Sequence, residues 1–89
     1  MITDQELKKL KKASEDANKA FEKAFKVVYY AAKAYDEAEK IYPPSSKEYK
    51  EIRKAYNKAD KAWGNAFNAA SRAYRAYKIA LNQKKRLKA

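Results

Sequence analysis

Residues 42–48 read Tyr42-Pro43-Pro44-Ser45-Ser46-Lys47-Glu48, the strongest chain-break signal in the sequence. Proline lacks an amide hydrogen and its ring collides with the preceding helical turn, so a proline pair cannot lie inside a helix. The pair also disfavours helical geometry at the residue before it. We therefore predict one domain of residues 1–89: a helix of about residues 4–42, a turn at 43–46, a helix of about residues 46–86, and a frayed basic tail to residue 89.

Each predicted helix begins with a capping signal. Thr3-Asp4-Gln5-Glu6 fits a capping box, in which the Thr3 hydroxyl accepts from the Glu6 amide and the Glu6 carboxylate bonds back to Thr3. Ser45-Ser46-Lys47-Glu48 has the same pattern, with Ser45 as the cap. The one glycine, Gly64, is predicted to lie inside the second helix, and the alternative is a break there that gives three helices.

A seven-residue repeat of apolar and small residues runs through both halves. This spacing keeps two columns of side chains on one face of a left-handed supercoil, which we call the seam. The first-half seam consists of Leu7, Leu10, Ser14, Ala17, Phe21, Ala24, Val28, Ala31, Tyr35, Ala38 and Tyr42. The second-half seam consists of Tyr49, Ile52, Tyr56, Ala59, Trp63, Ala66, Ala70, Ala73, Tyr77 and Ala80.

The short turn predicts that the two helices pair antiparallel as an all-α hairpin with an alanine-rich coiled-coil seam. Residues facing each other then have numbers that add to about 87, and large side chains face small ones. The predicted opposed pairs are Ala24 with Trp63, Phe21 with Ala66, Ala31 with Tyr56, and Tyr35 with Ile52.

The apolar stripe is wider than a two-helix seam requires. An alanine flank comprises Ala13, Ala20, Val27, Ala34, Ile41, Ala55, Ala62, Ala69 and Ala76, and an aromatic flank comprises Phe25, Ala32, Phe67, Tyr74 and Leu81. Such breadth is typical of a helix in a larger bundle. We therefore predict a non-enzymatic interaction module that forms a four-helix bundle as a homodimer or docks on another protein, with Phe25, Tyr29, Phe67, Tyr74 and Leu81 as the interface residues. The alternative is that alanines are merely tolerated on an exposed face, which fits the aromatic residues less well.

Positive charge is concentrated in the last third of the chain. The sequence has 22 basic and 11 acidic residues, but residues 61–89 hold eight basic residues and no acidic one. The alternative function is therefore binding of nucleic acid or another polyanion. The predicted site residues are Arg72, Arg75, Lys78, Lys84, Lys85 and Arg86, with Asn65 and Asn68 on the same outer face as Arg72 and Arg75.

A second interpretation of the charge is a solvated face that keeps the protein soluble. It is favoured by a lysine column that recurs every seven residues opposite the seam: Lys12, Lys19, Lys26, Lys33, Lys40, Lys47, Lys54 and Lys61. Binding to a membrane surface is not expected, because helix packing already occupies the apolar face.

The composition excludes several kinds of chemistry. The chain has no His and no Cys, so zinc sites built on them, thiol nucleophiles and histidine acid–base catalysis are excluded. No glycine-rich phosphate loop is present. We expect no catalytic residue, cofactor or metal, and a cytoplasmic location by default, because neither a signal-peptide pattern nor a run of about 18 apolar residues occurs.

Overall fold

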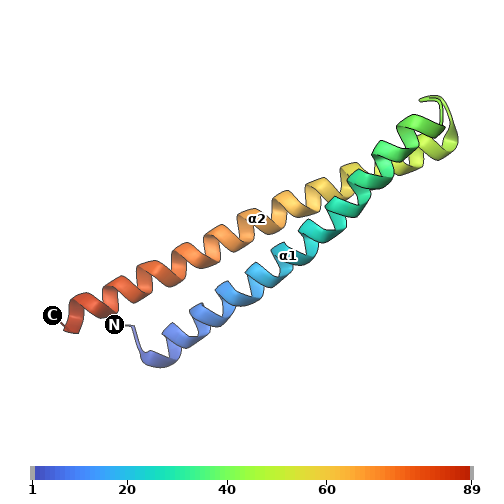
Figure 1. Ribbon diagram of the computed structural model, residues 1–89. Coiled ribbons are helices and arrows are strands. Elements are labelled where there is room, and N and C mark those ends of the chain that lie inside the picture. The colour runs from blue at the N-terminus through green and yellow to red at the C-terminus, as the bar shows by residue number, and fades with distance from the viewer. Residues whose placement is uncertain (1, 89) are drawn as a thin grey trace. The chain divides into compact units, whose positions relative to one another are not determined.

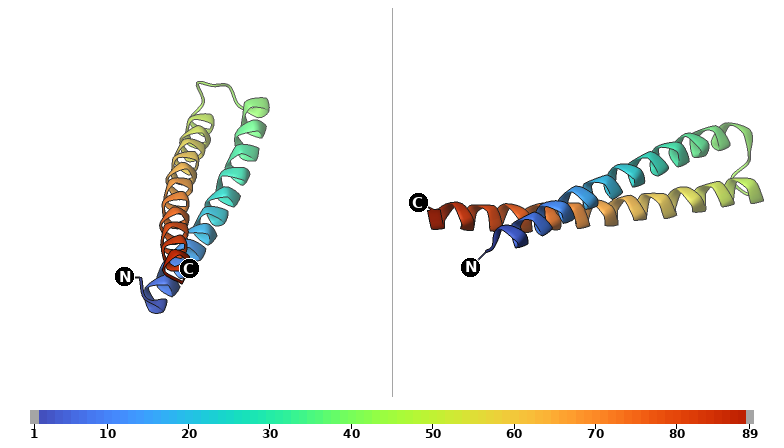
Figure 2. Two further views of the ribbon diagram at one scale, coloured as in Figure 1. Left: turned by 90° about the vertical axis from the view of Figure 1, so that its left-hand side faces the viewer. Right: turned by 90° about the horizontal axis from the view of Figure 1, so that it is seen from below.

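The protein is an all-α helical hairpin. The computed structural model describes residues 2–88, and it describes the side chains as far as residue 86. Helix α1 spans Asp4–Ile41 and helix α2 spans Lys47–Lys88, with a short turn between them (Figures 1 and 2). The helix bounds agree with the predicted ones to within two residues, and α2 continues through Gly64, so the three-helix alternative is wrong. Residue 89, the end of the tail expected to fray, lies outside the described residues.

Side-chain caps explain where both helices begin. The Thr3 hydroxyl accepts a hydrogen bond from the Glu6 amide at 3.1 Å, as predicted. For α2 the predicted cap was wrong by one residue: the Ser46 hydroxyl accepts from the Tyr49 amide at 3.2 Å. The turn accounts for the difference, because the Ser46 amide also donates to the Pro43 carbonyl at 2.9 Å, which closes a four-residue turn before the helix starts.

The chain divides into two compact units, each containing a piece of both helices. We call residues 1–21 with 66–89 the terminal unit and residues 22–65 the turn unit. In the terminal unit the two pieces run antiparallel, because Asp4 forms an ion pair with Lys84 and the rings of Phe21 and Phe67 lie 5.7 Å apart.

Aromatic side chains join the two helix pieces of the turn unit. The rings of Phe25 and Trp63 lie 6.1 Å apart. Nearer the turn, the Tyr35 ring lies 5.6 Å from Tyr49 and 5.5 Å from Tyr56, and the Tyr35 and Tyr49 hydroxyls are hydrogen-bonded at 2.9 Å. These distances are in the range of favourable tilted ring pairs. The antiparallel register predicted from the turn therefore agrees with the observed contacts in each unit.

The predicted seam is the interface between the helices. Every seam residue is buried or half-buried, whereas every residue of the alanine flank is exposed. The most buried positions are held by small side chains, among them Ala38 at 2% and Ala80 at 3% exposure. Small residues let helices approach closely. The expectation that large residues face small ones was incomplete, because aromatic rings also meet aromatic rings across the seam.

Gly64 offers a direct test of helix energetics. It lies in the middle of α2 without a positive φ angle, and a methyl group added there would meet nothing within 4 Å. We expect Gly64→Ala to raise the free energy of unfolding by about 0.5–1 kcal/mol, because alanine loses less backbone entropy in a helix. Urea denaturation followed by circular dichroism measures this, and an unchanged or lower midpoint would contradict it.

Candidate interaction surfaces

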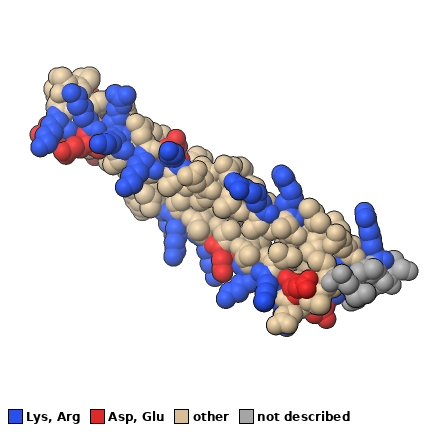
Figure 3. Space-filling model, turned by 180° about the vertical axis from the view of Figure 1, so that it is seen from behind, with Lys and Arg blue, Asp and Glu red and all other residues tan. Residues whose placement is uncertain are grey.

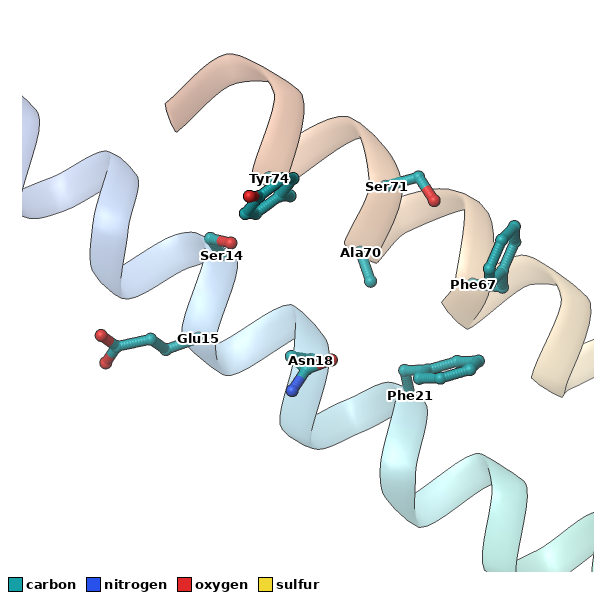
Figure 4. A pocket seen from close by; sticks show the side chains of 8 residues that line it. All are labelled: Ser14, Glu15, Asn18, Phe21, Phe67, Ala70, Ser71 and Tyr74. Carbon is teal, nitrogen blue, oxygen red and sulfur yellow. The ribbon is translucent and has the colours of Figure 1, made fainter. Parts of the chain in front are cut away.

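The terminal unit contains an open groove beside the seam. It has a volume of about 460 Å³ and is lined by Ser14, Glu15, Asn18, Phe21, Phe67, Ala70, Ser71 and Tyr74. Figure 4 shows its arrangement: Phe21 and Phe67 lie at one end, and Ser14 and Tyr74 lie opposite each other toward the other end. Ala70 points into the gap between the two helices, while the Glu15 carboxylate points away from it (Figure 4). The groove is therefore a hollow with small residues between aromatic ones.

The predicted interface residues differ in how accessible they are. In the terminal unit Phe67 is 54% and Tyr74 55% exposed, and both lie on the groove. Leu81, the third predicted interface residue of this unit, is less accessible, because its side chain is half-buried. Its position on α2 is close to the Asp4–Lys84 ion pair, where the two helix ends meet.

Two of the predicted interface residues belong to the turn unit. Phe25 is 49% exposed even though its ring packs against Trp63. Tyr29 is also about half exposed; it makes an edge contact with Tyr30, and the Lys33 ammonium lies 5.4 Å from the centroid of its ring. These two local contacts orient the Tyr29 ring without covering it.

Five of the six predicted polyanion-binding residues are exposed on α2: Arg72, Arg75, Lys78, Lys85 and Arg86. Lys84 differs, because its side chain is only 23% exposed and pairs with Asp4. It follows Tyr77 by seven residues and so continues the seam. Figure 3 shows one face of the molecule, where Lys and Arg side chains stand out from an uncharged surface and acidic side chains are fewer.

The hydrogen-bonded tyrosine pair of the turn unit was not anticipated from the sequence. The hydrogen bond that the Tyr35 hydroxyl donates to Tyr49, then burial, and then the proximity of Tyr49 as a second ionisable hydroxyl raise the pKa of the Tyr35 hydroxyl above its usual value. The two residues are predicted seam members, but their spacing does not reveal that their hydroxyls meet. We assign this pair a structural role.

Searches for other kinds of site gave negative results. Within residues 2–86, His, Cys, Asp and Glu side chains form no group of three or more that would hold a metal ion. Neither helix, over its described residues, has a stretch long and apolar enough to cross a membrane. Comparison of the chain with protein-family models, curated protein sequences and solved structures found no match.

Proposed function

We propose that this protein is a non-enzymatic association module that dimerises through the groove of the terminal unit. The observation that carries the proposal is the pairing of exposed aromatic side chains with a hollow on the same surface. Phe67 and Tyr74 each leave about half of their area exposed, and the groove between them and α1 has a volume of about 460 Å³. Exposed aromatic residues beside a concave surface are typical of protein interfaces.

A second copy of this chain is the partner that fits the groove best. A two-fold interface requires one surface to be complementary to itself, so that a projecting group and its receptor occur on the same patch. Here Tyr74 projects at the rim, and the small residues Ser14 and Ala70 leave the adjacent space. A copy related by a two-fold axis would place its aromatic ring in this space and receive the first copy's ring in return.

Association would also bury apolar surface that the single hairpin leaves exposed. The most buried seam positions hold small side chains, and the aromatic seam residues are only half-buried. Burial of apolar surface contributes about 25 cal/mol per Å². Covering Phe67 and Tyr74 in a four-helix bundle would bury aromatic area that a single hairpin leaves exposed to water.

The test compares oligomeric state in two matched double variants. We expect sedimentation equilibrium of the intact chain to show a concentration-dependent dimer. Phe67→Ser/Tyr74→Ser should weaken dimerisation by about tenfold or more, because central aromatic contacts dominate interface energies. The control, Val27→Ser/Ile41→Ser, removes two exposed apolar side chains of the alanine flank and should leave the dimer unchanged.

Two outcomes would contradict the proposal. A protein that stays monomeric at every concentration would show that the groove does not bind a second copy of the chain. Equal weakening by both double variants would place the interface elsewhere. Circular dichroism spectra of the variants separate loss of association from loss of folding.

The second candidate function is nucleic-acid binding by the basic last third of the chain. A specific observation favours it: residues 61–89 carry eight basic residues without an acidic one, and six of those cations are exposed on α2. The two functions are compatible, because Tyr74 lines the groove whereas its neighbour Arg75 projects on the outer side of the helix.

A further inference from the structure

The lysine column changes its chemistry within α2. It holds lysine at seven-residue intervals from Lys12 to Lys40 on α1 and from Lys47 to Lys61 on α2. In the α2 part of the terminal unit the next members of the column are Asn68, Arg75 and Asn82, and all three are exposed. This stretch of the column therefore presents amide and guanidinium groups, which form directed hydrogen bonds, in place of ammonium groups.

Cations lie on both sides of this changed column. In a helical heptad, the residues three before and three after Arg75 lie on opposite flanks of it. Arg72 and Arg86 occupy one flank, and Lys78 and Lys85 occupy the other. All four side chains are exposed, and residues 66–89 contain no Asp or Glu that would neutralise them.

The surrounding unit reinforces the positive potential. The terminal unit contains 12 basic and four acidic residues, a net charge of +8, whereas the turn unit contains 10 and seven, a net charge of +3. One of those four acids, Asp4, is already paired with Lys84, so it does not neutralise the outer face. The Lys78 ammonium lies 6.0 Å from the centroid of the Tyr74 ring, a contact that leaves its charge in place.

An α-helix of ordinary width fits the major groove of B-form DNA. An α-helix with its side chains is about 10–12 Å across, and the major groove is about 12 Å wide. Flanking cations would then reach the phosphates on the two groove edges, while the central column faces the base edges. Asn and Arg are the side chains that pair bidentately with adenine and guanine there. The major groove of A-form RNA is too narrow to admit a helix in this way.

We propose that the outer face of α2, from Asn68 to Arg86, binds double-stranded DNA in the major groove. Asn68, Arg75 and Asn82 contact base edges along about 21 Å of helix, at about 1.5 Å per residue. Arg72, Lys78, Lys85 and Arg86 bind the phosphates. This surface is separate from the groove proposed for dimerisation, so either proposal stands without the other.

Binding is tested by fluorescence anisotropy with a labelled mixed-sequence DNA duplex at several salt concentrations. We expect the logarithm of affinity to fall linearly with the logarithm of salt, with a slope near −3.6 for four phosphate contacts. Arg72→Gln/Arg86→Gln should reduce the magnitude of this slope by about 2 and weaken binding by about tenfold. The control, Lys26→Gln/Lys54→Gln, removes the same charge from exposed lysines of the turn unit and should change both values little.

Base reading is tested by selecting preferred duplexes from a randomised pool. Arg75→Ala should reduce the preference for the selected duplex over a scrambled one by about tenfold. Its affinity for the scrambled duplex should fall less than its affinity for the selected one. If the Arg72/Arg86 and Lys26/Lys54 double variants weakened DNA binding equally, the proposal would be wrong and the binding would be nonspecific charge attraction. Tighter binding to duplex RNA, or to vesicles of anionic phospholipid, than to duplex DNA would likewise overturn it.

Discussion

Replacing Ala38 by Asp is expected to lower the free energy of unfolding by at least about 3 kcal/mol. Ala38 is 2% exposed, the lowest exposure in the core of the described chain. An aspartate there would either bury a carboxylate without a partner or force the helices of the turn unit apart. Because small domains are stable by only about 5–15 kcal/mol, we expect a large loss of helical signal on mild heating.

Ala34→Asp provides the matched control for this substitution. Ala34 lies one turn earlier on α1 and is exposed, so the same residue is introduced on the same helix without burial. The intrinsic helix propensity cost, about 0.5–0.7 kcal/mol, is common to both variants. Urea denaturation of the two proteins isolates the burial effect. Comparable midpoints would show that the seam does not carry the stability we assign to it.

Truncating Tyr35 is expected to produce the second large effect. Its ring contacts those of Tyr49 and Tyr56 at 5.6 and 5.5 Å, and its hydroxyl is bonded to the Tyr49 hydroxyl. Tyr35→Ala should therefore cost about 2–3 kcal/mol, through lost ring packing and a residual cavity. Tyr35→Phe keeps the ring and loses only the hydrogen bond, so it should lower the unfolding midpoint much less. Equal losses in the two variants, measured by urea denaturation, would contradict this account.

The same hydroxyl predicts how stability depends on alkaline pH. Because the Tyr49 hydrogen bond raises the pKa of Tyr35 in the folded protein, the folded state holds this proton more tightly than the unfolded state. The resulting stabilisation is fully present below the unfolded tyrosine pKa of about 10, and it is lost as the pH rises through the higher folded value. Tyr35→Phe should reduce the alkaline loss of stability. Urea denaturation at several alkaline pH values measures this, and an equal alkaline loss in Tyr35→Phe and the unmodified protein would contradict it.

The sequence patterns predicted many residues of both candidate surfaces, but they did not predict how these residues are arranged in space. The seven-residue repeat predicted that Phe67 and Tyr74 lie next to the seam, and both side chains are exposed as expected. That they border a hollow with Ser14 and Ala70 depends on side chains contributed by the other helix. Lys84 was predicted to be a polyanion-binding residue because it is basic. Its ion pair with Asp4 joins opposite ends of the chain, so no nearby residue in the sequence indicates it.

Local stereochemistry explains the features that could be predicted from the order of residues. Prolines 43 and 44 end a helix whatever the rest of the chain does, and a seven-residue repeat of apolar residues defines one buried face on each helix. The hairpin, its register and the seam therefore follow from short stretches of residues. Two contacts could be found only in the folded chain: the cap of α2 by Ser46 rather than Ser45, and the hydrogen bond between the Tyr35 and Tyr49 hydroxyls. Both depend on atomic positions that the packed helices and the turn fix to within about 1 Å, whereas residue type and spacing do not fix distances so closely.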